Sequence, residues 1–189
     1  ELELDELRTL LEVSERRELV FRHIETAFSE AREHRFKHAM LRDVAYETVL
    51  KRDRANYHAC VAKWLETVSG ERRSEYLPQI AEHYDKAGNV VKADLCYEQA
   101  GKQAMRVSAF SDAVRFFRQV HTPSTECLLN WAEAYYNLGE FPSAFATLEE
   151  AKMKENCDKE RAAVLALSGE IARVTGDYVK AQEILDEAI

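Results

Sequence analysis

The chain has 189 residues and a formal net charge of −8, from 26 Lys and Arg against 34 Asp and Glu. This acidic balance disfavours binding to a phosphate backbone, and no apolar run approaches the ~18 residues of a membrane-spanning helix. Hydrophobic residues make up 46% of the chain, with only 3 Pro and 6 Gly, which favours an all-helical globular fold.

The first part of the chain predicts a helix followed by a short β-hairpin. Residues 3–12 place leucines on one stripe, which is typical of an amphipathic helix. Residues 18–24 and 34–38 are rich in β-forming side chains, so we expect them to pair as antiparallel strands. A continuous helix is the alternative, because residues 25–35 contain no Gly or Pro to force a turn. His38 is expected to cap or brace the junction with the next helix.

Residues 39–70 are predicted to form two helices. An apolar stripe begins at Met40, and a second stripe stops just before Gly70, which is a common helix terminator. The polar run over 71–75 is expected to be a linker. The basic cluster over 51–54 is interspersed with acids, so exposed i,i+4 ion pairs are expected there rather than a nucleic-acid site.

Beyond residue 76, a small residue precedes an alanine by five positions four times. The four pairs are Gly88/Ala93, Ser108/Ala113, Gly139/Ala144 and Gly176/Ala181. This spacing is typical of the turn between the two helices of a tetratricopeptide-like repeat. The small residue permits a tight turn, and the alanine lets the second helix pack closely on the first.

Large and small residues recur in register with these turns. Small residues lie seven positions before each turn, at Ala81, Gly101, Ala132 and Gly169. Large residues lie nine positions after it, at Tyr97, Phe117, Leu148 and Leu185. We therefore expect small side chains where helices touch and large ones where gaps need filling.

One helix is expected to serve two repeats, because Gly88 and Ser108 are only 20 residues apart. The predicted helices cover 76–87, 90–106, 110–120, 124–138, 141–155, 159–175 and 178–189. The last would leave Ile184, Leu185 and Ile189 uncovered, so either more repeats follow or two copies associate through this end. The missing initial Met and the end inside a helix predict a fragment of a longer protein.

A resemblance to a known family rests on the middle of the chain. The segment Arg35-Phe-Lys-His-Ala-Met-Leu-Arg-Asp-Val-Ala-Tyr-Glu-Thr-Val-Leu50, followed by Tyr57-His58 and Ile80-Ala-Glu-His-Tyr84, resembles the region after the nucleotide-binding module of large bacterial signalling (STAND) ATPases. These are often fused to a class III adenylate cyclase, a kinase or a transcription-factor domain.

The resemblance implies three parts. They are a winged-helix-like tail over 1–38, linker helices over 39–70 and tetratricopeptide-like repeats over 71–189. No Gly-x-x-x-x-Gly-Lys-Ser/Thr motif occurs in the sequence, so nothing here would cradle a triphosphate. The resemblance therefore implies a regulatory arm rather than an ATPase or cyclase site.

Cysteines and histidines predict no chemistry of their own. The four cysteines, Cys60, Cys96, Cys127 and Cys157, form no CxxC pair, which indicates reduced, mostly buried thiols in a cytoplasmic protein. The six histidines lack metal-ligand spacing, and His83 is expected to be buried and hydrogen-bonded. We expect no catalytic residue, no cofactor and no metal.

The repeat register also predicts a partner groove. Residues on the expected concave face are Glu98, Lys102, Met105, Arg106, Leu129, Glu133, Tyr136, Asn137, Ala166, Glu170 and Arg173. This mixed, partly apolar lining suits a peptide or a helix. A solvated surface without a ligand is the alternative, because repeat grooves are generic.

These patterns predict an all-α, right-handed α-solenoid of tetratricopeptide-like repeats. Its expected role is non-enzymatic: it binds a protein or peptide partner, or other domains of its parent signalling ATPase or cyclase. We expect no membrane partner, and a homodimer through the last helix. Two alternatives are a DNA-binding regulator that uses residues 1–40, and a small-molecule sensor that uses the spaces between helices.

Overall fold

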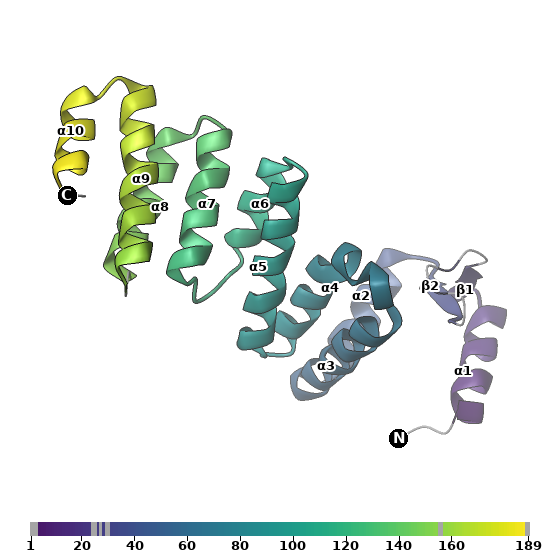
Figure 1. Ribbon diagram of the computed structural model, residues 1–189. Coiled ribbons are helices and arrows are strands. Elements are labelled where there is room, and N and C mark those ends of the chain that lie inside the picture. Colours follow the sequence, from purple (N-terminus) through teal and green to yellow (C-terminus); the bar gives the residue numbers. More distant parts are fainter. Residues whose placement is uncertain (1–3, 24–25, 27, 29–30, 155–156, 188–189) are drawn as a thin grey trace.

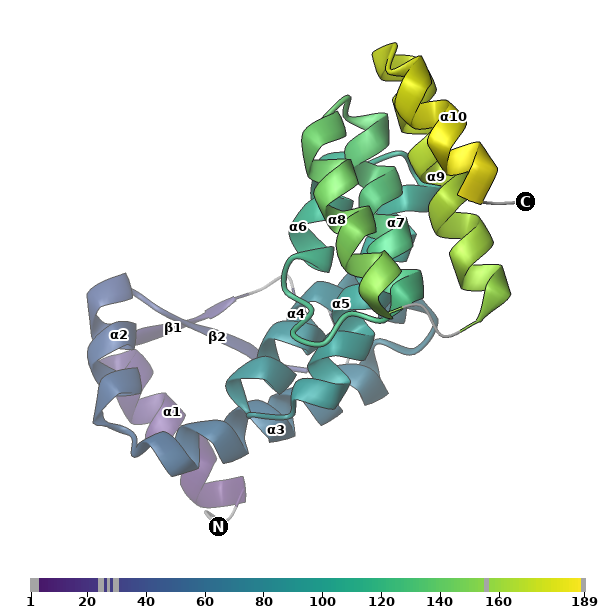
Figure 2. The same ribbon diagram turned by 90° about the vertical axis from the view of Figure 1, so that its left-hand side faces the viewer.

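The computed structural model describes residues 4–23, 26, 28, 31–154 and 157–187, and it is mostly helical. The α helices are α1 (Leu4–Arg16), α2 (Ala39–Thr48), α3 (Lys51–Val68), α4 (Arg73–Lys86), α5 (Val90–Arg106), α6 (Phe110–Phe117), α7 (Thr125–Asn137), α8 (Phe141–Lys154), α9 (Asp158–Thr175) and α10 (Tyr178–Glu187). From α3 to α10, successive helices pack side by side in one elongated row (Figures 1 and 2). The predicted tetratricopeptide-like array is confirmed as a row of helical hairpins, while its superhelical hand stays a prediction.

The predicted β-hairpin is present at the N-terminal end of the row (Figure 1). Strands β1 (Val20–His23) and β2 (Glu33–Phe36) are antiparallel, with Val20 opposite Phe36. The continuous-helix alternative is therefore wrong for the part of this segment that the structure describes. Residue 24, which the prediction included in the first strand, lies outside the described residues.

The four turns that carry the predicted small residue all use the left-handed backbone region. Gly88, Gly139 and Gly176 have φ of 75°, 75° and 79°, and Ser108 has φ of 57°. In each turn the next residue's amide donates to a carbonyl five positions earlier at 2.9 Å, the hydrogen bond of a Schellman motif. Glycine adopts this region without a Cβ penalty, which is why a small residue recurs at the turn.

The alanines that follow the turns pack as predicted in three of the four cases. Ala93, Ala113 and Ala144 are fully buried, whereas Ala181 of the last hairpin is partly exposed. Their large partners in the same register, Tyr97, Phe117 and Leu148, are also buried. The predicted counterpart Leu185 has a side chain outside the described part of the structure.

Helix α5 packs against both α4 and α6, as the short spacing between the first two turns predicted. Its contact with α6 depends on the absence of a side chain at Gly101. A Cβ there would lie 2.4 Å from the Phe117 ring, closer than any real carbon contact. The glycine thus leaves space that the fully buried Phe117 occupies.

Two boundaries in the repeat array differ by three residues from the predicted ones. A 3₁₀ turn at Gly70–Arg72 runs directly into α4, so the expected linker is mostly helical. Helix α6 ends at Phe117 rather than near residue 120. Beyond it, Asp94 on α5 accepts hydrogen bonds from the backbone and side chains of His121 and Thr122 at 2.7–3.0 Å. This buried carboxylate therefore holds the connecting loop against α5.

Helix α2 is unusual because every one of its residues is exposed. His38 is its N-cap residue, but the His38 side chain makes no capping hydrogen bond, so the predicted capping role is wrong. At the other end, Arg54 donates to the carbonyls of Glu47 and Val49 at 2.7 Å each. It satisfies backbone groups that a helix end leaves without partners. The i,i+4 pairing predicted for the basic cluster is therefore wrong for Arg54.

The cysteines divide into two classes. Cys96 and Cys127 are buried, and burial raises the pKa of the Cys127 thiol to about 12. Cys60 on α3 and Cys157 before α9 are exposed, so the prediction of mostly buried thiols is wrong for these two. Among the described residues, no helix has both the length and the apolar character that crossing a bilayer requires.

Candidate partner-binding face

The eleven residues of the predicted groove lie on three helices that neighbour one another. Glu98 to Arg106 are on α5, Leu129 to Asn137 on α7, and Ala166 to Arg173 on α9. Helix α7 contacts both α5 and α9, and the three lie side by side (Figure 1). We call this surface the α5/α7/α9 face.

A lysine joins the first two helices of this face. Lys102 Nζ on α5 lies 2.8 Å from Glu98 on its own helix and 2.7 Å from Glu126 on α7. Burial alone would lower the pKa of Lys102, but the hydrogen bonds to Glu126 and Glu98 outweigh it and raise the pKa. The sequence prediction missed Glu126, since no local pattern connects it to a residue 24 positions earlier.

A tyrosine joins the second and third helices. The Tyr136 hydroxyl on α7 donates to Glu170 Oε1 on α9 at 3.3 Å, and Arg173 binds the same carboxylate at 2.6 Å. The hydrogen bond from Arg173 is the largest cause that lowers the pKa of Glu170, and the hydrogen bond from Tyr136 lowers this pKa further. The Tyr136 ring lies 6.0 Å from Phe141, another residue that the groove prediction did not include. Three of the predicted residues therefore form one connected group.

Apart from Glu98 and Lys102, the other predicted residues are not brought into such a group. Met105 and Leu129 are half-buried and pack against the hydrophobic core. Asn137 donates to the carbonyl of Glu133, one turn back on the same helix, at 2.8 Å. The side chains of Arg106 and Ala166 are exposed. The face therefore combines half-buried apolar side chains with exposed polar groups.

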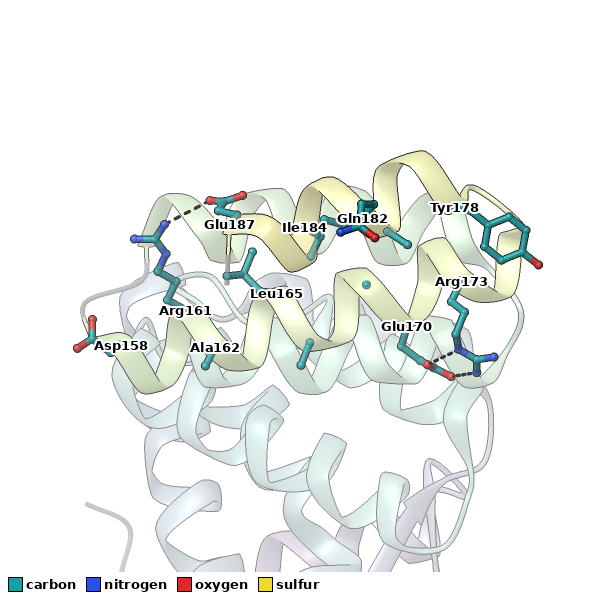
Figure 3. Close-up of a pocket in the computed structure, with 13 residues that line it drawn as sticks. Asp158, Arg161, Ala162, Leu165, Glu170, Arg173, Tyr178, Gln182, Ile184 and Glu187 are labelled. Atoms are coloured by element: carbon teal, nitrogen blue, oxygen red, sulfur yellow. Dashed lines mark hydrogen bonds and ion pairs between the residues drawn. The ribbon is translucent and has the colours of Figure 1, made fainter. Parts of the chain in front are cut away.

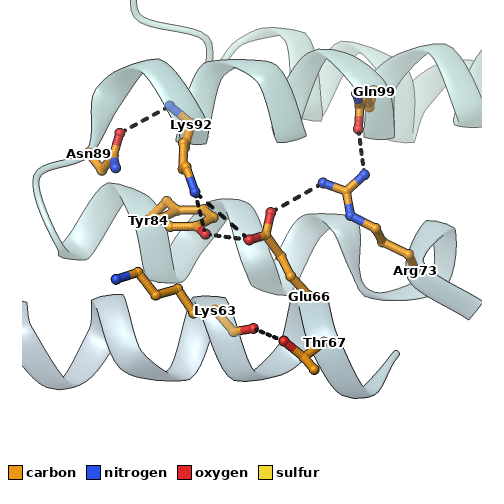
Figure 4. Close-up of polar contacts among 8 residues, drawn as sticks. All are labelled: Lys63, Glu66, Thr67, Arg73, Tyr84, Asn89, Lys92 and Gln99. Carbon is orange, nitrogen blue, oxygen red and sulfur yellow. Dashed lines mark hydrogen bonds and ion pairs between the residues drawn. The ribbon is translucent and has the colours of Figure 1, made fainter. Parts of the chain in front are cut away.

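A polar junction connects the array to the preceding helix α3 (Figure 4). The nearly fully buried Tyr84 on α4 donates to Glu66 on α3 at 2.6 Å, and Lys92 on α5 donates to the Tyr84 hydroxyl at 3.1 Å. Arg73 donates to the other oxygen of Glu66 at 3.3 Å. Burial would raise the pKa of Glu66, but the hydrogen bonds from Tyr84 and Arg73 outweigh it and lower the pKa. Three helices thus share one carboxylate.

Two histidines form a second contact between α3 and α4. His58 Nδ1 lies 2.8 Å from His83 Nδ1, and the Tyr46 hydroxyl on α2 lies 3.0 Å from His58 Nε2. The predicted hydrogen-bonded role of His83 is confirmed, although this side chain is only partly buried. Burial is the largest cause that lowers the pKa of both imidazoles.

The N-terminal unit does not present a strongly basic surface among its described residues. Arg8, Arg16, Arg35 and Lys37 each pair with a nearby carboxylate. Within the described ranges, no group of three or more His, Cys, Asp or Glu side chains could hold a metal ion.

Comparisons with known proteins are sparse. No protein-family model matches the chain, and no curated protein does. A solved structure from Podosopora anserina, described as a kinesin light chain with nearly identical TPR-like repeats, aligns with 17% sequence identity and a TM-score of 0.41. The alignment covers 81% of this chain and 95% of that one.

Proposed function

We propose that this chain is a non-enzymatic interaction module whose α5/α7/α9 face binds a peptide or helix of a protein partner, or of another domain of its parent protein. The observation that carries the proposal is the Tyr136–Glu170–Arg173 group next to half-buried apolar side chains. A tyrosine and an arginine on a rigid helical scaffold are the residue types that most often dominate binding energy.

The proposal extends to the parent protein and the form of the array. We infer a right-handed solenoid in a cytoplasmic signalling ATPase of the family that the sequence resembles, with the N-terminal unit as the tail of a winged-helix-like domain. The division at residues 38 and 70 is part of this proposal. It is supported by the quoted sequence motif and by the β-hairpin that precedes α2.

Helix α5 is the element through which binding would be transmitted. It contributes Lys102 to the proposed face, and Lys92 to the junction with Tyr84 and Glu66. A ligand that moves α5 therefore changes contacts to α3 and α4. Such a movement of α5 would bias the equilibrium between the on and off states of the parent protein. It does so only when the ligand binds one of these two states more tightly than the other.

The test uses peptides selected against the intact chain from a random library. We expect Tyr136→Ala to weaken their binding at least tenfold, because about 1.4 kcal/mol of contact energy corresponds to that factor. Tyr57→Ala is the matched control, since Tyr57 is a 63% exposed tyrosine on α3, outside this face. Selected peptides that tolerate Tyr136→Ala as well as Tyr57→Ala would show that the face is not the binding site.

A second readout tests the transmission. Peptide binding is expected to change amide hydrogen exchange in α3 and α4 as well as in α5 and α7, and Glu66→Ala is expected to remove the change in α3. If hydrogen exchange changed only in α5 and α7, the proposed binding role would stand. The proposed transmission to α3 and α4 would then be wrong.

We also propose that two copies associate through α10, the last described helix. Tyr178 and Val179 on this helix are 72% and 73% exposed. The predicted contributions of Leu185 and Ile189 to this surface lie outside the described side chains.

A further inference from the structure

Two histidine contacts hold the C-terminal turn of helix α4. His83 on α4 contacts His58 on α3, and Asp85, two positions further along α4, contacts His121 in the loop between α6 and α7. Helix α4 itself packs between α3 and α5 (Figure 1). Because the imidazole of histidine changes its charge near neutral pH, the protonation state that each contact requires decides when this turn is held.

The contact with α3 requires that His58 and His83 together carry no more than one added proton. Their Nδ1 atoms are 2.8 Å apart, a distance that leaves room for one hydrogen, so one ring donates and the other accepts. The Tyr46 hydroxyl on α2 continues this chain at His58 Nε2, at 3.0 Å. One imidazolium still donates to a neutral partner, whereas two would bring two N–H groups and two positive charges face to face. A second proton therefore breaks the contact.

The charged groups around this histidine pair do not offset the repulsion. Glu82 and Lys86 on α4 form an ion pair with each other, so the carboxylate that raises the pKa of the imidazoles is accompanied by an ammonium group that lowers it. On α3, the guanidinium carbon of Arg54 lies 4.7 Å from the centre of the Tyr46 ring and adds a positive charge on that side. Burial is the largest cause that lowers the pKa of both imidazoles.

The contact with the loop has the opposite requirement, because His121 lies between two carboxylates. Its Nδ1 is 2.9 Å from Asp94 Oδ1 on α5, and its Nε2 is 3.3 Å from Asp85 Oδ1 on α4. An ionised carboxylate only accepts hydrogen bonds, so both ring nitrogens must carry hydrogen and the ring must be an imidazolium. A neutral ring that keeps its hydrogen bond to Asp94 turns the lone pair of Nε2 toward Asp85, and the link to α4 is lost.

Loss of this proton releases α4 without releasing the loop. The backbone amides of His121 and Thr122 donate to Asp94 at 2.9 and 3.0 Å, and neither amide titrates. Among the described residues, Asp85 and Asp94 are the charged groups that face the ring. The hydrogen bond to Asp94 is the largest cause that raises the pKa of His121, and the negative charge of Asp85 raises it further. His121 thus gains its proton at a higher pH than the histidines of the α3 contact do.

We propose that the C-terminal turn of α4 is a pH-responsive element, which binds α3 through the His58–His83 pair only while that pair carries at most one added proton, and binds the loop only while His121 is protonated. The folded-state pKa of His121 lies above the unfolded value of 6.5, so its contact is complete below pH 6.5 and is lost as the pH rises through the folded-state value. The pair has folded-state pKa values below 6.5, so its contact is complete above pH 6.5 and is lost as the pH falls through them. Both contacts are therefore present together in a window around pH 6.5.

The element acts on the junction between α3, α4 and α5. Tyr84 lies between His83 and Asp85 in the sequence, donates to Glu66 on α3 and accepts from Lys92 on α5. A change of pH in either direction away from the window removes one of the two contacts that flank Tyr84. The junction is therefore expected to loosen at both high and low pH.

The test follows the intact chain by NMR from about pH 5 to about pH 8. The imidazole shifts are expected to show two coupled titrations below pH 6.5 for His58 and His83, and one titration above pH 6.5 for His121. Amide exchange in the last turn of α4, corrected for its intrinsic pH dependence, is expected to be slowest near pH 6.5 and faster on either side.

Two variants separate the contacts. Asp85→Asn is expected to lower the pKa of His121 and to abolish the faster exchange at high pH, because an amide can donate to a neutral ring and accept from a charged one. His58→Gln is expected to raise the pKa of His83, because it removes the charge of His58 that lowers this pKa. It is also expected to abolish the faster exchange at low pH, since glutamine takes up no proton.

Glu187→Gln and His38→Gln are the matched controls. Glu187 pairs with Arg161 at 3.5 Å in the pocket between α9 and α10 (Figure 3), and the His38 side chain makes no capping hydrogen bond at the start of α2. Neither control is expected to change the exchange of α4 or the titration of the three histidines that hold it.

Three results would overturn the proposal. Exchange in the last turn of α4 that changes in one direction only over this pH range would show that one of the two contacts does not control the turn. A His121 pKa that Asp85→Asn leaves unchanged would remove the loop contact, and a His83 pKa that His58→Gln leaves unchanged would remove the pair. Controls that shift these values as much as the test variants do would show a general effect of charge.

Discussion

Gly101→Ala is expected to destabilise the protein, although alanine is the better helix former. The added Cβ would lie 2.4 Å from Phe117 Cε1 and 2.7 Å from Cδ1 and Cζ. The ring has no accessible surface, so it cannot turn outward. Overpacking of this kind costs ~1–3 kcal/mol, and the gain in helix propensity returns about 1 kcal/mol. We expect a net loss of up to about 2 kcal/mol, which corresponds to a melting temperature lower by up to about 8 °C.

The chain contains its own control at the equivalent position of the last repeat. A Cβ at Gly169 would meet Ile184 Cγ2 at 3.7 Å, which is an ordinary van der Waals contact. Gly169→Ala should therefore show only the propensity term and stabilise the protein by about 1 kcal/mol. Urea unfolding followed by circular dichroism measures both variants.

A double-mutant cycle assigns the cause. Combining Gly101→Ala with Phe117→Leu is expected to cost less than the sum of the two single losses, because the smaller side chain makes room for the methyl group. If Gly101→Ala were as stable as Gly169→Ala, or if the two losses simply added, the Phe117 ring would not be the reason for the glycine.

Three further outcomes follow from backbone, charge and exposure. Gly139→Ala is expected to cost about 1–2 kcal/mol in unfolding free energy, because φ is 75° there and a residue with a Cβ is strained in the left-handed region. No atom lies within 4 Å of the new Cβ, so an unchanged value would contradict left-handed strain. Burial holds the folded-state pKa of His58 and His83 below the unfolded value of 6.5. The unfolded chain thus takes up protons first as the pH falls, so this contribution to stability is complete above pH 6.5 and declines below it. Urea midpoints across this range should lose that decline when both residues are replaced by Gln, and a variant with the same pH dependence would refute the assignment. A thiol reagent is expected to modify Cys60 and Cys157 in the folded chain and the other two cysteines only after denaturation; four equally fast thiols would be inconsistent with the burial described.

Much of the array could be predicted because its rules are local. The turn residue, the alanine five positions later and the large residue beyond it lie within one hairpin, so their spacing follows from helix geometry alone. Hence α5 has its predicted bounds, and Ser108 occupies the same left-handed turn position as the glycines. The eleven groove residues were likewise assigned to neighbouring helices by their register.

Contacts between hairpins could not be predicted in the same way. Glu126 meets Lys102, and Asp94 holds the loop at His121, across sequence separations that no periodic pattern encodes. The exposure of Cys60 and Cys157 could not be predicted either, since the spacing of cysteines along the chain does not tell which of them face solvent.

The sequence by itself determined that helices would form, where they would turn and which small residues would separate them, because backbone sterics and helical periodicity act over a few residues. Only the tertiary structure decided which charged groups meet and that the Phe117 ring occupies the space beside Gly101. Those outcomes depend on how whole helices stack against one another.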